Sequence, residues 1–196
     1  MTVPGSGPAG KTPHALLWRL EGPAWEVAGL AGLDLCRAEL DAERLRARGT
    51  ALVADAEPFR VDYEVETGAG FVTERVSVSV EAGGGFRRIE LGRGRSPELE
   101  GRMDVDLAGL PLFNTLPILR LGLLGREEGS AHDIEAAFVG LPGLEVVPSR
   151  QRYTVVGEGR VRYESLDSSF RADLEVDADG FVVAYPNLAT RLRPSR

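Results

Sequence analysis

The stretch Val72-Thr-Glu-Arg-Val-Ser-Val-Ser-Val80 decides the fold class, because apolar and polar residues alternate along it with a period of two. In an extended chain its alternate valines share one face, and the arginine and serines between them take the other. Residues 60–66 and 170–177 alternate in the same way. Such a pattern is typical of an antiparallel strand that has one buried face and one wet face.

Glycine-rich turns separate these runs at the spacing of β-hairpins. The turns are expected at residues 67–70, 83–85, 157–159 and 177–180, where glycine or aspartate tolerates a positive φ. Further strands are predicted at residues 14–20, 24–30, 33–40, 50–55, 86–91, 150–156, 160–166 and 181–185. About a dozen short strands without a long break predict an all-β fold, a single large antiparallel sheet rolled into a barrel-like shape.

Helix has little room in this pattern. One short helix is predicted over residues 114–121, with Asn114 or Thr115 as its cap and Pro117 in its first turn. Residues 38–48 are interpreted as a strand end followed by a turn. Residues 1–13 are rich in Pro, Gly and Ser and are predicted to be a flexible tail, which leaves residues 14–196 as a single β-domain.

Composition and charge narrow the class of protein. The 196 residues are 43% hydrophobic and 27% charged, which excludes a disordered or fibrous chain. A net charge of −7 argues against a nucleic-acid partner. No apolar run approaches the roughly 18 residues of a membrane span, and no secretory signal is recognised. The lone Cys36 fits a reducing compartment, so a cytoplasmic location is expected.

Residues able to support catalysis are sparse. His14 and His132 are the only histidines, which leaves too few His and Cys ligands for a zinc site, and neither a metal nor another cofactor is predicted. Asp104 and Asp106 lie two apart on a predicted strand, hence on one face and about 7 Å apart. Paired carboxylates can divide acid and base roles, although a solvated acidic face is the commoner explanation.

Aromatic residues occupy apolar-face positions of the predicted strands. They are Trp18, Tyr63, Tyr153, Tyr163, Phe181 and Tyr185. Two interpretations remain open: an ordinary barrel core, or the lining of a cavity in which phenol hydroxyls meet the polar head of a ligand.

The chain also resembles a known family. Asp104-Val-Asp-Leu107, Phe113-Asn-Thr-Leu-Pro-Ile118, Arg162-Tyr-Glu-Ser-Leu166 and Val183-x-Tyr185-Pro186 together resemble the bacterial putative glycolipid-binding family over roughly residues 14–193. Two departures stand out. Gly101-Arg102 replaces an expected Gly-Cys, and Leu110-Pro-Leu-Phe-Asn114 replaces an expected Thr-Pro-Phe-Thr-Asn.

The resemblance implies a spirally rolled sheet with an internal cavity, likened to periplasmic lipoprotein carriers, and no catalytic residues. The leading hypothesis is therefore a non-catalytic protein that binds a lipid or glycolipid. Its predicted lining residues are Trp18, Tyr63, Tyr153, Tyr163 and Tyr185, with Arg75, Asn114 and Arg120 meeting the head group. The alternatives are a hydrolase or isomerase that uses Asp104 and Asp106, and a protein-interaction module that pairs through an exposed sheet edge. The oligomeric state is left open.

Overall fold

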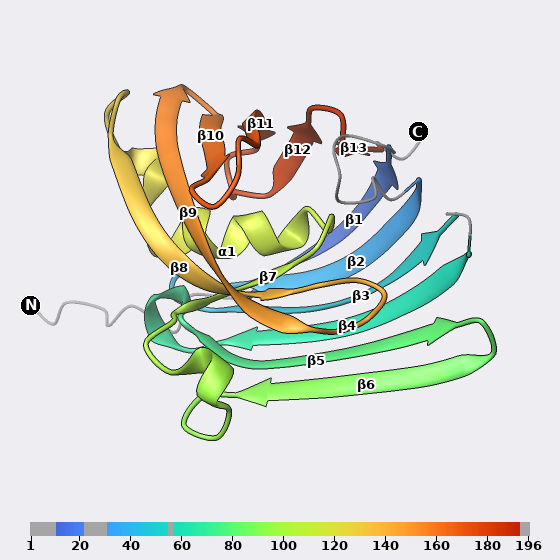
Figure 1. Ribbon diagram of the computed structural model, residues 1–196. Helices are drawn as coiled ribbons and strands as arrows, with labels where there is room; N and C mark the ends of the chain where they lie inside the picture. The colour runs from blue at the N-terminus through green and yellow to red at the C-terminus, as the bar shows by residue number, and fades with distance from the viewer. Residues whose placement is uncertain (1–10, 22–30, 55–56, 193–196) are drawn as a thin grey trace, which may run out of the picture.

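The computed structural model describes residues 11–21, 31–54 and 57–192, and a single curled sheet dominates them (Figure 1). The strands are β1 (Thr12–Leu20), β2 (Gly32–Leu40), β3 (Leu45–Val53), β4 (Phe59–Thr67), β5 (Thr73–Ala82), β6 (Gly85–Gly92), β7 (Asp104–Leu107), β8 (Ala131–Val139), β9 (Val146–Gly157), β10 (Arg160–Ser165), β11 (Arg171–Val176), β12 (Val182–Tyr185) and β13 (Ala189–Arg191). The helices are α1 (Leu112–Arg120) and the 3-10 turns η1 (Ala69–Phe71), η2 (Pro97–Leu99) and η3 (Leu123–Gly125).

The strands follow the order β6-β5-β4-β3-β2-β1-β13-β12-β11-β10-β9-β8-β7 in one 13-stranded sheet. The sheet is open, with β6 and β7 at its two edges, and it curls strongly, so the expected all-β roll is confirmed. The expectation of a wholly antiparallel sheet is wrong at one place, because β7 and β8 are parallel. The connection between them, residues 108–130, contains α1, and a helical crossover is what a parallel pair requires.

Period-two alternation gives the sheet a dry face and a wet face. On β4 the side chains of Phe59, Val61, Tyr63 and Val65 are buried, and the residues between them are exposed or half-buried. The buried side chains face α1, which lies inside the curve of the sheet (Figure 1). We call this side the concave face and the opposite side the outer face. The core of the protein lies between the concave face and α1.

Helix α1 is buried on all sides rather than along one stripe. Every residue from Leu112 to Ile118 is buried, as expected for a helix enclosed by a sheet. The helix begins two residues before the predicted start, with Pro111 at its N-cap, so Asn114, Thr115 and Pro117 all lie inside it. The predicted cap is therefore wrong: the buried Asn114 side chain bonds to a strand instead of to the helix backbone.

Three other strands differ from expectation, and a fourth predicted strand lies outside the described residues. Strand β3 begins at Leu45, within the predicted turn, because Leu45 and Ala47 face inward while the arginines beside them face outward. Strand β8 was not predicted; its first half alternates only between exposed and half-buried residues, and its buried residues lie in the second half without strict alternation. Strand β1 begins at Thr12, inside the predicted tail, and the strand predicted at residues 24–30 lies outside the described residues.

Hydrogen bonds join the start of β5 to the residues just before β7 and so hold the curl of the sheet. Thr73 N–H, at the start of β5, donates to the Met103 carbonyl just before β7 at 2.9 Å. The Arg93 guanidinium donates to the carbonyls of Thr73 and Arg102 at 2.8 and 2.9 Å. Arg93 thus ties the start of β5 to the segment that leads into β7 and its two aspartates.

Candidate functional site

Four aromatic rings gather on the concave side of the sheet, three of them on β9, β10 and β12 and the fourth, Phe170, directly before β11. Tyr153 and Tyr163 are register partners on β9 and β10, with ring centroids 5.5 Å apart. Tyr163 also contacts Phe170 and Tyr185, at 5.9 and 6.3 Å between ring centroids. We call Tyr153, Tyr163, Phe170 and Tyr185 the tyrosine cluster. It brings together three of the five aromatic residues predicted to line a cavity.

A carboxylate from β7 lies beside this cluster. Asp106 is partly buried, and Gln151 Nε2–H of β9 donates to its Oδ2 at 2.7 Å. Burial raises the pKa of Asp106 to about 6; the bond from Gln151 opposes this rise, and neighbouring Asp104 adds to it. The tyrosines are affected in turn, because burial first and the Asp106 charge second raise the pKa of Tyr163. The site therefore combines phenols with a carboxylate that is easily protonated.

A hydrogen-bond chain fixes the position of Asp106 relative to α1. Asn114 Nδ2–H donates to Tyr153 Oη at 3.0 Å, and Tyr153 Oη–H donates to Gln151 Oε1 at 3.2 Å. Gln151 then donates to Asp106 through its other side-chain atom. The amide and phenol groups of the chain are buried, and each finds a partner, as buried polar groups require. The chain makes Gln151 a central site residue, although the sequence analysis did not single it out.

Asp104, the other aspartate of β7, has a different environment. Arg120, in the last turn of α1, binds Asp104 bidentately, with Nε 3.0 Å from both carboxylate oxygens and Nη2 2.6 Å from Oδ2. Burial raises the pKa of Asp104, and the Arg120 charge and hydrogen bonds oppose that rise. Asp104 is thus a structural anchor for the helix, whereas the Oδ1 atom of Asp106 accepts no hydrogen bond from the described residues.

Two phenols of the cluster stand out because their hydroxyl groups form no hydrogen bond with the described residues. Tyr163 and Tyr185 are 7% and 5% exposed, and among the described residues neither hydroxyl has a hydrogen-bond partner. A phenol can both donate and accept one or more hydrogen bonds. The buried side-chain atoms that lack a partner among the described residues belong to His14, Thr73, Arg102 and Thr115, so the two phenol oxygens remain within reach of solvent. Water or a ligand can therefore complete their hydrogen bonds.

The other predicted site residues lie elsewhere. Trp18, fully buried on β1, donates from Nε1 to the Val182 carbonyl at 2.9 Å. Arg75 lies on the outer face of β5 and pairs with Glu90 at 2.9 Å, so the structure does not bring it together with Asn114 and Arg120. A head group that contacts Asn114 and Arg120 on the concave side cannot reach Arg75 through the sheet.

Tyr63 and Asp34 form a second group of buried polar side chains, apart from the tyrosine cluster. Its ring lies over Gly49 of β3, where even a Cβ atom would collide with the ring. Its hydroxyl crosses β3 and donates to Asp34 Oδ1 on β2 at 2.9 Å. Burial raises the pKa of Asp34 to about 7, and the bond from Tyr63 opposes this rise. Asp34 was not among the predicted site residues, although it shares the inward face of β2 with Cys36.

The described residues provide neither a metal site nor a membrane-spanning helix. No group of three or more His, Cys, Asp or Glu side chains in the described chain could hold a metal ion. No described helix is long and apolar enough to cross a bilayer. The two residues where the family resemblance expects threonine, Leu110 and Phe113, are both buried under the sheet, so they serve packing here.

Comparison with known proteins agrees with the resemblance seen in the sequence. The family model described as putative glycolipid-binding matches residues 23–191. The chain is also similar to a DUF1089 family protein from Pseudomonas aeruginosa, known from a crystal structure at 1.80 Å resolution. The two are 28% identical, the match covers 88% of this chain and 95% of that one, and the TM-score is 0.69. No curated protein matches the chain.

Proposed function

Because the chain belongs to the putative glycolipid-binding family, we propose that it binds a lipid or glycolipid on the concave face, with the polar head at the tyrosine cluster. The observation that carries this proposal is that Tyr163 and Tyr185 are buried residues whose hydroxyls have no hydrogen-bond partner among the described residues. They lie beside Asp106, whose carboxylate is oriented by Gln151. Such a group of convergent polar atoms on an apolar wall is typical of small-molecule sites.

The chemistry of the cluster suits a sugar head group. The Asp106 carboxylate accepts hydrogen bonds from hydroxyls, and the two phenols can donate to or accept from neighbouring hydroxyls. The flat faces of Tyr163 and Phe170 offer apolar contact to the C–H faces of a sugar ring. Arg120 is already engaged with Asp104, so on this proposal it orients the helix rather than meeting the head group.

An acyl chain would gain its free energy from the apolar concave face. Each methylene removed from water contributes about 0.8 kcal/mol. Trp18 and Tyr63 have their polar atoms satisfied inside the protein, so they would present only ring surface to such a chain. Affinity would therefore rise with chain length, and the head group would set specificity.

The test is native mass spectrometry of the purified protein, followed by organic extraction of any bound species. A co-purifying molecule with acyl chains supports the proposal, and the single variants Tyr163→Phe and Tyr185→Phe should each weaken its retention about tenfold, since a hydrogen bond to a ligand is lost. Tyr63→Phe is the matched control, because its hydroxyl is bonded to Asp34. An unliganded mass that persists after incubation with a mixed lipid extract would refute the proposal.

An enzymatic function has one observation in its favour. The pKa of Asp106, raised by burial to about 6, is close to that of an effective general acid or base. The predicted division of acid and base roles between Asp104 and Asp106 is less favoured, because Asp104 is bound to Arg120. Release of free sugar or fatty acid from a bound glycolipid, abolished in Asp106→Asn but kept in Asp179→Asn, would favour catalysis over binding alone.

A further inference from the structure

The outer face of β1–β3 exposes a group of leucines. Leu33, Leu35 and Leu52 are 45%, 50% and 57% exposed. The strand registers place them side by side: Leu33 is opposite Leu52, and Leu35 is opposite the half-buried Leu17. We call these four residues the leucine patch. Contiguous exposed apolar side chains mark interaction sites more often than scattered ones do.

Arginines surround the leucine patch on two sides. Along one row of the sheet, Arg19 is opposite Leu33 and Arg60 is opposite Leu52. Each of these two arginines has an exposed acidic partner, Glu21 and Asp62 respectively. Such exposed pairs are weak and exchange readily with other anions.

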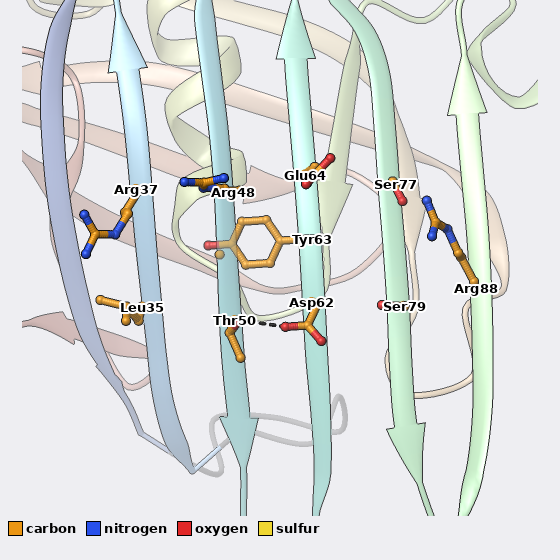
Figure 2. Close-up of a pocket in the computed structure, with 11 residues that line it drawn as sticks. Leu35, Arg37, Arg48, Thr50, Asp62, Tyr63, Glu64, Ser77, Ser79 and Arg88 are labelled. Atoms are coloured by element: carbon orange, nitrogen blue, oxygen red, sulfur yellow. Dashed lines mark hydrogen bonds between the residues drawn. The ribbon is translucent and has the colours of Figure 1, made fainter.

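The other side of the patch carries two arginines at directly opposite positions of neighbouring strands. Arg37 and Arg48 are direct cross-strand partners on β2 and β3, next to Leu35 (Figure 2). Neither forms a salt bridge within the described chain. Like charges at directly opposite positions destabilise a sheet. Glu64 of β4, opposite Arg48 on its other side, offsets part of this repulsion, and an anionic partner near Arg37 would relieve the rest.

A shallow groove extends the arginine pair across the sheet. Its volume is about 410 Å³, and its polar lining on β3 to β6 includes Thr50, Ser77 and Ser79, the acidic Asp62 and Glu64, and Arg88 (Figure 2). Hydroxyl groups and guanidinium groups are the usual donors to phosphate oxygens. The two carboxylates repel an anion, so an anionic head group fits only the end of the groove that Arg37 and Arg48 line, next to the apolar patch.

We propose that the leucine patch and its four arginines form a docking surface for an anionic lipid bilayer. The leucines would enter the interfacial region, and Arg37 and Arg48 would bind lipid phosphates there. Leucine beside arginine is the combination that attaches amphipathic surfaces to anionic membranes. The overall charge of −7 does not oppose this, because at physiological salt charges beyond about 8 Å are largely screened. The proposal is independent of what the concave face binds.

Vesicle co-sedimentation of the full chain tests this proposal. We expect binding to vesicles of phosphatidylcholine with phosphatidylglycerol, little binding to phosphatidylcholine alone, and release by high salt. The variants Leu35→Ser and Leu52→Ser should each weaken binding at least fivefold. Phe86→Ser, which removes a more exposed apolar side chain from the edge strand β6, is the matched control and should leave binding unchanged.

The charge contribution is separated by a second set of variants. Arg37→Gln with Arg48→Gln should weaken binding to anionic vesicles at least tenfold and reduce its dependence on salt, whereas Arg152→Gln on the distant strand β9 should have little effect. No binding to anionic vesicles, or binding that these variants leave unchanged, would overturn the proposal. A concentration-dependent mass that Leu35→Ser abolishes, without vesicle binding, would assign the patch to a second copy of the chain and likewise overturn it.

Discussion

Replacing Asp34 with asparagine is expected to stabilise the protein at alkaline pH and to leave it nearly unchanged at acidic pH. Asp34 is fully buried on the concave face of β2, and the donor within reach of it is the hydroxyl of Tyr63. A buried carboxylate with one neutral donor is poorly compensated when charged. Asparagine keeps the shape and an oxygen that accepts the Tyr63 bond, but it carries no charge.

The magnitude follows from the pKa. Burial raises the pKa of Asp34 from 3.8 to about 7, so the folded state holds the proton more tightly than the unfolded state does. The resulting stabilisation is complete below about pH 3.8 and is lost as the pH rises through 7. At about 1.36 kcal/mol for each pKa unit, the whole effect is about 4 kcal/mol, of which about 3 kcal/mol falls between pH 5 and pH 9.

Urea unfolding followed by the fluorescence of buried Trp18 measures the effect at several pH values. The free energy of unfolding of Asp34→Asn, minus that of the wild type, should grow by about 3 kcal/mol from pH 5 to pH 9. Asp179→Asn, in an exposed turn, controls for the simple loss of a carboxylate. A difference that stays constant over this range would refute the reasoning, because it would mean that Asp34 does not titrate there.

Three further substitutions test the packing and polar contacts of the concave face. Gly49→Ala should lower the free energy of unfolding by about 1–3 kcal/mol, because the new methyl group meets the Tyr63 ring; an unchanged urea midpoint would contradict the close approach. Arg120→Met should cost about 3–5 kcal/mol by leaving Asp104 buried and unpaired, and adding Asp104→Asn should recover part of that loss in a double-mutant cycle. Tyr153→Phe should cost about 1–3 kcal/mol in thermal or urea unfolding, since it interrupts the bonds to Asn114 and Gln151. A loss below 0.5 kcal/mol there would show that the chain is dispensable.

Part of the candidate site could be predicted from sequence. Alternation placed Tyr153, Tyr163 and Tyr185 on inward faces, and all three are buried together. It placed Arg75 on the opposite face from the valines of β5, and the structure accordingly separates Arg75 from them. Asn114 was singled out as unusual, but its partner is 39 residues away on β9. No pattern within a few residues of Asn114 predicts a partner at that separation in the sequence.

The sequence by itself determined the fold class, the hairpin connections and which side of each strand faces inward, because these depend on the period of apolar residues and on turn chemistry within a few residues. It did not determine that β7 would pair in parallel with β8, or that β7 would be joined to β5 by Arg93. Those contacts depend on how strongly the sheet twists and curls around α1, which is a property of the whole assembly. For the same reason only the tertiary structure distinguished Asp104, held by Arg120, from Asp106, which lies beside two unpaired phenols.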